Sequence, residues 1–280
     1  MGHDRRCAHP PRLRGGRGPR GPADRQLGGC GMKRLAIAVW LLACPNVLGD
    51  ITTDLGTHYQ SEQTSGTTLT AAVGNNGTLS GGRNFSNLTT SSKGGGLNLA
   101  HNYDGSADYS TATITGGIAY PFTLSCWYKP DDFDAISSPV AIHNSGDISQ
   151  YIGLRVDSST GALRVVRRVD PVNDLHSVGS TLTAGQWYHI TVAFQSQTAY
   201  DVYVNGSLVG SFSGRDSVAV SSSFNTITVG GLRPSTWLAD GPIDDVRYYT
   251  RAIVSGDNSE LFYLGSPVRF VINSSRQRRN

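Results

Sequence analysis

Hydrophobic and polar residues alternate over short stretches of the chain from about residue 55 onwards. Residues 122–128, FTLSCWY, show the pattern most clearly, because every second residue from Phe122 to Tyr128 is apolar and two of the residues between them carry hydroxyl groups. A period of two places alternate side chains on opposite faces of a strand, so this stretch predicts a half-buried strand. Cys126 falls on the apolar face, where we expect a buried and unreactive thiol.

Further strands are predicted wherever short apolar or alternating runs are bounded by turn residues. They cover residues 151–156, 162–169, 187–194, 200–204, 207–212, 226–229 and 243–249. Residues 158–161, SSTG, and the pair Asn205 and Gly206 favour tight hairpin turns, because glycine and asparagine tolerate positive φ angles. Only residues 255–264 favour a helix, as one short segment.

About a dozen predicted strands and no long helix indicate an all-β protein. So many strands hide their apolar faces by stacking as two sheets or by closing as a barrel, and we expect a two-sheet antiparallel sandwich. No internal repeat or linker divides residues 50–264, which are expected to form one domain. Residues 265–280 are interpreted as a tail that forms an edge strand or is disordered.

The N-terminal region differs in composition from the rest of the chain. Residues 1–31 are rich in Gly, Pro and Arg and cannot bury a core. We interpret them as the product of a start codon assigned too early, with a disordered basic arm as the alternative. From Met32 the chain has two basic residues, an apolar run over 35–43 and a small residue at Gly49, which is the pattern of a secretory signal peptide over residues 32–49.

The apolar run also limits how the chain meets a membrane. Its nine residues are too few for a transmembrane span, which needs about 20. Residues 41–44, LLAC, resemble a bacterial lipobox, in which Cys44 would carry a lipid anchor. Secretion after cleavage near Gly49 and anchoring at Cys44 are therefore the two alternatives for an exported protein.

The positive charge of the whole chain comes from its N-terminal region. The chain carries 24 basic and 21 acidic residues, which gives a formal charge of +3. Residues 1–49 hold nine of the basic and two of the acidic residues, so residues 50–280 have 15 basic and 19 acidic residues and a net charge of −4. A mildly acidic domain gives no electrostatic reason to expect nucleic-acid binding.

Six short motifs follow one another along the predicted domain. In chain order they are residues 74–79 (GNNGTL), 104–109 (DGSADY), 122–130 (FTLSCWYKP), 185–192 (GQWYHITV), 201–206 (DVYVNG) and 241–252 (GPIDDVRYYTRA). Together they resemble the laminin G-like, concanavalin A-like lectin and glucanase domains, and the resemblance implies a jelly-roll sandwich of a bacterial-type secreted protein. Ala239 and Asp240 depart from the family pattern, which has an aromatic residue before the closing glycine.

Catalytic chemistry is not indicated by the residues of the predicted domain. Glycoside hydrolases use two carboxylates that flank one bond, about 5–5.5 Å apart in retaining enzymes. Residues 50–280 contain two glutamates, Glu62 and Glu260, and neither has an acidic partner at the spacing that jelly-roll hydrolases use. Asp244 and Asp245 are expected on opposite faces of a strand, and His189 is interpreted as a strand residue rather than a base. We therefore expect no enzyme and keep glycoside hydrolysis as a remote alternative.

Calcium is the one cofactor that the resemblance raises. Ca²⁺ binds six to eight oxygen atoms of carboxylates, carbonyls and water, and domains of the resembled family often carry it near a sheet edge. Asp104, Asp108 and Asp244 are the expected ligands. In the alternative interpretation Asp104 forms a turn with Gly105 and Asp244 accepts hydrogen bonds from backbone groups.

An aromatic residue in a loop is the best indication of a ligand site. Sugars are bound by stacking on aromatic rings and by short polar side chains that contact hydroxyl groups. Trp237 lies in a loop over residues 233–240, outside the strand pattern, with Arg233 and Asp240 at the ends of that loop. These three residues are the candidate ligand site. Together with the signal-peptide pattern and the lack of a catalytic pair of carboxylates, they favour an exported, non-catalytic glycan-binding module. The alternative is a structural or adhesion domain of the cell envelope that binds protein partners, in which Trp237 is only a packing residue.

Overall fold

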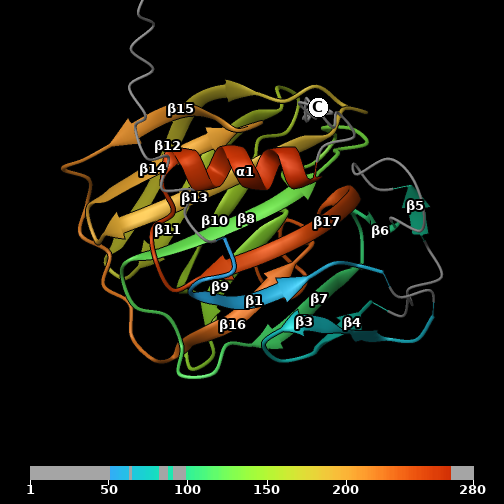
Figure 1. The fold of residues 1–280 in the computed structure, drawn as a ribbon, viewed down its shortest axis with the longest axis horizontal. Helices are drawn as coiled ribbons and strands as arrows, with labels where there is room; N and C mark the ends of the chain where they lie inside the picture. The colour runs from blue at the N-terminus through green and yellow to red at the C-terminus, as the bar shows by residue number, and fades with distance from the viewer. Residues whose placement is uncertain (1–50, 63–64, 82–87, 91–98, 266–280) are drawn as a thin grey trace, which may run out of the picture. The chain divides into compact units, whose positions relative to one another are not determined.

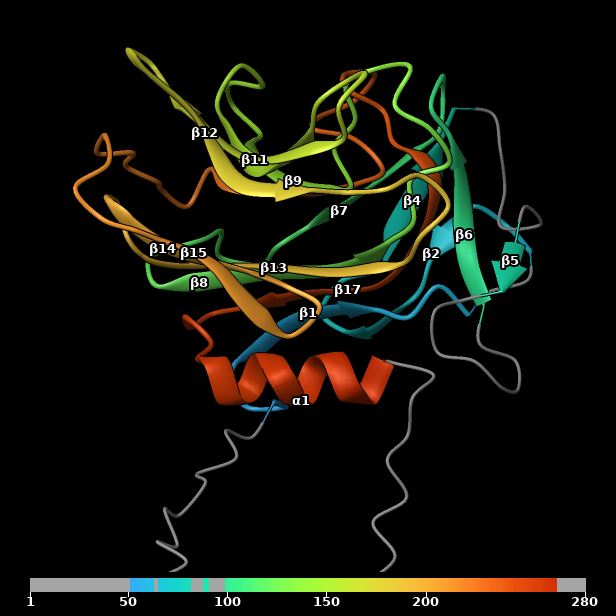
Figure 2. The same ribbon diagram turned by 90° about the horizontal axis from the view of Figure 1, so that it is seen from above.

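The structure is a computed structural model that describes residues 51–62, 65–81, 88–90 and 99–265. The predicted signal peptide with Cys44 and most of the predicted tail lie outside these residues. The described part consists of two antiparallel sheets packed face to face, with one helix on the outside (Figures 1 and 2). This is the predicted two-sheet sandwich, although the described residues form 17 strands rather than about a dozen.

One sheet has nine strands in the order β15-β14-β13-β8-β17-β1-β3, with β6 also paired to β17 and β5 paired to β6. Its strands are β1 (Leu55–Tyr59), β3 (Ala71–Val73), β5 (Leu88–Thr90), β6 (Leu99–Asp104), β8 (Phe122–Tyr128), β13 (Tyr188–Ser196), β14 (Ala199–Val204), β15 (Ser207–Phe212) and β17 (Asp240–Tyr249). Strand β17 therefore pairs with β8 on one side and with β6 and β1 on the other.

The other sheet has eight strands in the order β12-β11-β10-β9-β16-β7-β4-β2. Its strands are β2 (Thr68–Leu69), β4 (Gly77–Ser80), β7 (Tyr109–Thr113), β9 (Val140–Asn144), β10 (Tyr151–Val156), β11 (Ala162–Val169), β12 (Val172–Thr181) and β16 (Phe224–Val229). Strands β10 and β11 have the bounds predicted from the sequence, whereas β12 was not predicted. Its sequence, VNDLHSVGST, is mostly polar, as suits a strand at the edge of a sheet.

The hydrophobic core lies between the two sheets. Leu124 and Cys126 of β8 pack there in one cluster with Ile152 and Leu154 of β10. The thiol of Cys126 is completely buried, which confirms the prediction, and this burial raises the pKa of Cys126 well above its ordinary value. Since the thiolate is the reactive form of cysteine, Cys126 is a packing residue.

Helix α1 (Ser255–Gly265) covers the outer face of the nine-stranded sheet (Figure 2). The ring of Phe262 stacks on Trp127 with centroids 5.6 Å apart, and Leu261 packs with Tyr203 and Tyr249. Strand β8 is consequently buried on both faces, and the prediction of a half-buried strand was wrong because the helix covers the side that carries Thr123, Ser125 and Trp127. In the part of the chain described here, no helix is both long and apolar enough to cross a membrane.

The hairpin between β14 and β15 carries the predicted turn. Asn205 and Gly206 have φ angles of 51° and 79°, as a two-residue hairpin of this kind requires. A Cβ atom at Gly206 would lie 3.2 Å from Phe262. The turn therefore needs glycine for its backbone angle, and the close approach of helix α1 gives a second reason for it.

Candidate functional site

The connection between β16 and β17, residues 230–239, brings the predicted ligand residues to the eight-stranded sheet. Its conformation is fixed by backbone hydrogen bonds: the Leu232 amide donates to the Thr236 carbonyl at 3.0 Å, and the Ser138 amide donates to the Trp237 carbonyl at 2.8 Å. Trp237 has a φ angle of 50°, which is unusual for a bulky residue. These bonds and the φ angle define the backbone conformation of the loop at Trp237.

Trp237 and Arg233 meet two residues of β10 on the outer face of the eight-stranded sheet. The guanidinium of Arg155 lies 4.8 Å from the centroid of the Trp237 ring, and that of Arg233 lies 5.6 Å from the centroid of Tyr151. The Tyr151 and Trp237 rings meet edge to face with centroids 6.3 Å apart. We call these four residues, Tyr151, Arg155, Arg233 and Trp237, the arginine–aromatic face.

Strand alternation explains why β10 presents these residues outward. Ile152, Leu154 and Val156 belong to the core, so Tyr151, Gly153 and Arg155 project from the opposite face of the strand. Trp237 contacts the residues on either side of Gly153, where a Cβ atom would approach Ala141 Cβ to 2.5 Å. A glycine at this position lets the strands and the loop pack closely.

Asp240 does not join this face, although it was predicted with Trp237 and Arg233. It begins β17 and is paired with Asp104 at the end of β6. Around them lies a pocket of about 190 Å³, which we call the acidic pocket. Its lining residues are Asp104, Gly105, Ser106, Asp132, Asp134, Ala135, Ser137, Leu238 and Asp240. The structure thus places Arg233 and Trp237 in the arginine–aromatic face and Asp240 in the acidic pocket.

The carboxylates of the acidic pocket are in different environments. Partial burial disfavours the charged form of Asp104, but hydrogen bonds from the backbone amides of Ala107, Ser106 and Asp108 and from the Ser106 hydroxyl outweigh it and hold the pKa of Asp104 well below its ordinary value. For Asp240, burial and then the charges of neighbouring aspartates raise the pKa. The main neighbours are Asp132, Asp131, Asp104 and Asp134.

The predicted calcium ligands do not come together as one group of three. Asp104 accepts the turn hydrogen bonds just described, and Oδ1 of Asp244 accepts a hydrogen bond from the backbone amide of Asp245 at 2.6 Å. Asp244 lies four residues beyond Asp240 on β17, about 13 Å along a strand. Among the described residues, no group of three or more His, Cys, Asp or Glu side chains is arranged to hold a metal ion.

Calcium therefore stays a prediction, which thermal melting tests. If the protein binds calcium, its melting temperature should be higher in millimolar calcium than in the presence of a chelator. An unchanged melting temperature would contradict the predicted metal site.

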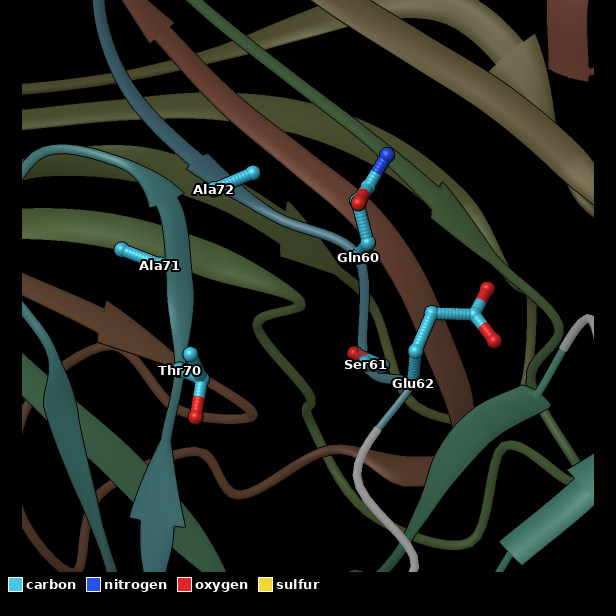
Figure 3. Close-up of a pocket in the computed structure, with 6 residues that line it drawn as sticks. All are labelled: Gln60, Ser61, Glu62, Thr70, Ala71 and Ala72. Atoms are coloured by element: carbon cyan, nitrogen blue, oxygen red, sulfur yellow. The ribbon is translucent and has the colours of Figure 1, made fainter.

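The two glutamates lie in separate places. Glu62 follows β1 beside an open hollow of about 260 Å³ that is lined by Gln60, Ser61, Glu62, Thr70, Ala71 and Ala72. Figure 3 shows the Ser61 hydroxyl on the side of Thr70, whereas the Glu62 carboxylate points the other way. Glu260 lies in helix α1. The residues that line the hollow therefore include one carboxylate, that of Glu62, and no pair of carboxylates.

Histidine chemistry is also restricted by burial. His189 is 2% exposed beneath helix α1, with Nε2 2.9 Å from the Ser125 hydroxyl oxygen. Burial lowers the pKa of His189 to about 3, with smaller effects of Asp245 and Arg247. A buried, weakly basic imidazole agrees with the interpretation of His189 as a structural strand residue.

Asp244 and Asp245 are expected on opposite faces of a regular strand, but β17 is irregular at these two residues. The register with β8 shifts between Asp244 and Arg247, and Asp245 has a φ angle of 49°. The carboxylate of Asp245 binds Nε2 of His58 at 2.5 Å and the guanidinium of Arg247. Simple alternation does not apply at a β-bulge, and Asp245 is a member of a buried charged cluster.

A family model described as the concanavalin A-like lectin/glucanases superfamily matches residues 101–257, more than half of the chain. No curated protein matches it in sequence.

Solved structures share the fold at low sequence identity. Domain 4 of a GH43 extracellular arabinanase from Geobacillus stearothermophilus, solved with arabinotriose, has a TM-score of 0.59 and 19% identity and covers 74% of this chain and 98% of that domain. Trypanosoma rangeli sialidase has a TM-score of 0.53 and 17% identity over 75% of this chain and 33% of the sialidase. The binding domain of botulinum neurotoxin serotype D has a TM-score of 0.53 and 14% identity over 78% of this chain and 55% of that domain.

The family is shown by the family model, and the solved structures share its fold. The match to the family model extends from β6 into helix α1, and the two-sheet sandwich is shared with the solved structures. The chain belongs to the concanavalin A-like lectin/glucanases superfamily, as a laminin G-like domain.

Proposed function

We propose that the protein is an exported, non-catalytic module that binds a glycan at the arginine–aromatic face. The observation that carries the proposal is the meeting of Trp237 and Arg233 with Tyr151 and Arg155 on one outer face. Helix α1 covers the outer face of the nine-stranded sheet, whereas no helix of the described residues lies over the eight-stranded sheet (Figure 2). Export is inferred from the signal-peptide pattern of residues 32–49.

A glycan is the favoured ligand for two reasons. Members of this superfamily are described as lectins and glucanases, and the arabinanase domain with the same fold was solved with a bound arabinotriose. Guanidinium groups held against aromatic rings also provide fixed hydrogen-bond donors, which suit ligands rich in oxygen atoms.

The proposal of a non-catalytic role rests on the carboxylates of the acidic pocket. Asp104 and Asp240 have pKa values displaced in opposite directions, which in an enzyme can distinguish a base from an acid. Asp104 is, however, engaged by three backbone amides and one hydroxyl group of its own turn. A carboxylate bound in this way caps a turn and is a poor nucleophile or base.

One observation favours the second candidate function, a cell-envelope adhesion domain with a protein partner. Strand β15 is an edge strand with the uncharged sequence SLVGSF, and Leu208 and Val209 are 52% and 37% exposed. An exposed apolar edge can add a strand from another protein.

A glycan array probed with the purified protein tests the proposal. Binding to a defined glycan class that is lost in Trp237→Ala and retained in Trp187→Ala would support it, because Trp187 directly precedes β13 of the nine-stranded sheet, away from the proposed site. Absence of glycan binding, together with retention on envelope fractions that is lost on adding charge at Leu208, would favour the adhesion domain. Release of new reducing ends from any bound glycan, abolished by Asp240→Asn, would contradict the non-catalytic role.

A further inference from the structure

Four arginines lie together on the outer face of the eight-stranded sheet. In the β10–β11 ladder Arg155 is paired with Arg164, and Tyr151 is paired with Arg168. Paired residues project to the same face of a sheet, so Arg155, Arg164 and Arg168 extend outward together. They are spread over five consecutive residue pairs, or about 14 Å, and Arg233 of the β16–β17 loop joins them above Tyr151.

The aromatic rings of this face support the arginines. Arg155 lies over the Trp237 ring and Arg233 over the Tyr151 ring, and Tyr151 is only 6% exposed. Arg233 also donates from Nη1 to the Ile148 carbonyl at 2.9 Å. Because a guanidinium occupies a side of each ring, the groups offered to a ligand are mainly fixed N–H donors rather than bare aromatic surfaces for stacking.

Positive charge exceeds negative charge locally. Asp157 forms ion pairs with both Arg155 and Arg164. Arg168 forms an ion pair with Asp170 at 3.4 Å, and its charge also helps to lower the pKa of Asp147. Four guanidinium groups therefore face three carboxylates, in a domain whose residues 50–280 carry a net charge of −4. Burial and then the charge of Arg233 also lower the pKa of the neighbouring His143 to about 4.

We infer that the ligand of this face is an anionic glycan, whose carboxylate or sulfate groups are bound by these four arginines. The inference rests on the proposed glycan-binding function and specifies its ligand class. Planar guanidinium groups bind carboxylate and sulfate oxygens through paired N–H donors, and several fixed in a row match a polymer with repeated anionic groups.

The test measures the affinity of the purified protein for a polyuronate, a sulfated glycosaminoglycan, a neutral arabinan and single-stranded DNA at two salt concentrations. We expect both anionic glycans or one of them to bind at least tenfold more tightly than arabinan, and more weakly at high salt. Arg168→Gln and Arg233→Gln should each lower the affinity roughly tenfold, and Arg168→Lys less. Lys129→Gln, which removes the same charge directly after β8 of the nine-stranded sheet, should have no effect, and unchanged melting temperatures should show that the variants fold.

Each other outcome is informative. Equal binding of arabinan that is insensitive to Arg168→Gln but lost in Trp237→Ala would overturn the inference and leave the proposed glycan function intact. DNA binding as tight as glycan binding, or an equal loss in Lys129→Gln, would show unspecific attraction of polyanions and also overturn it. Failure of every glycan to bind would refute the proposed function itself.

Discussion

Asp104 and Asp240 are paired directly across β6 and β17, yet the pKa values of their carboxyl groups are displaced in opposite directions. Asp104 receives hydrogen bonds that favour its charge, whereas Asp240 is partly buried and faces the charges of four other aspartates. The same pocket therefore contains one carboxylate that stabilises the fold and one that opposes it at neutral pH.

Replacing Asp240 by asparagine should stabilise the protein at pH 7. Because the folded-state pKa of Asp240 is raised, its ionised form costs stability above that pKa, and the cost vanishes as the pH falls below the unfolded-state value. The group is only partly buried, so the gain should be no more than about 1 kcal/mol. Thermal melting at pH 7 and pH 3 would show a higher melting temperature for Asp240→Asn only at pH 7. Asp201→Asn, on β14, is the control, and a lower melting temperature for Asp240→Asn at pH 7 would contradict the explanation.

Replacing Asp104 by alanine should have the opposite effect. The variant loses the acceptor of three backbone amides and of the Ser106 hydroxyl, at a cost of about 1–3 kcal/mol. The pKa of Asp104 is lower in the folded than in the unfolded state. Its ionised carboxylate therefore stabilises the native protein above the unfolded-state pKa, and this stabilisation is lost as the pH falls through the folded-state pKa. Urea unfolding should show the full difference at pH 7 and a smaller one near pH 3. Asp104→Asn, which retains one acceptor, should be intermediate, and an alanine variant as stable as the native protein would exclude the capping role.

The buried ion pair of Arg167 and Asp174 should be the most sensitive charged contact. Arg167 is 0% exposed, and Asp174 accepts hydrogen bonds from Arg167 and Arg215 that lower its pKa despite burial. Asp174→Asn leaves a buried guanidinium without its counter-charge, and we expect a loss of about 3–5 kcal/mol in urea unfolding. Arg215→Gln removes the more exposed partner and should cost less than about 1 kcal/mol. Similar losses in both variants would show that burial of Arg167 is not the decisive factor.

Weakening the contact of helix α1 should change the titration of His189. Phe262 lies over both Trp127 and His189, with ring centroids 5.6 and 6.4 Å away. In Phe262→Ala water gains access to the imidazole, and its pKa should rise from about 3 towards its ordinary value of 6.5. An NMR pH titration of the histidine ring protons measures the change. Tyr263→Ala, at a neighbouring position that is 51% exposed, should leave the pKa of His189 unaltered; an equal rise in both variants would point to general loosening of the helix.

Much of the fold could be predicted from local patterns. Strands β10, β11 and β15 have the predicted bounds because their runs end at turn residues, and the motif residues that indicate the family lie mainly on other strands, among them β4, β8, β13, β14 and β17. Strand β12 could not be predicted, since its stability comes from pairing with β11 rather than from an apolar pattern. Arg167 shows the same limit: its position in the alternation suggests no ion pair, and Asp174 reaches it only through the β11–β12 register.

The candidate site could be predicted only in part. Trp237 and Arg233 were identified because a loop tryptophan departs from the strand pattern. Tyr151 and Arg155 were missed, since each is an ordinary member of an alternating strand, and only the fold of the β16–β17 loop brings them under Trp237 and Arg233. Asp240, adjacent in sequence, belongs instead to the pairing of β17 with β6.

The covering of one sheet by helix α1 has a practical consequence for measurement. A label or tether attached to the helix, for example at Leu264, which is 57% exposed, would sit on the side of the nine-stranded sheet (Figure 2). Protein immobilised through that position would be oriented with the arginines towards the solution, whereas random coupling would block a fraction of the molecules. The helix is thus a suitable attachment site for binding assays with the protein immobilised on a surface.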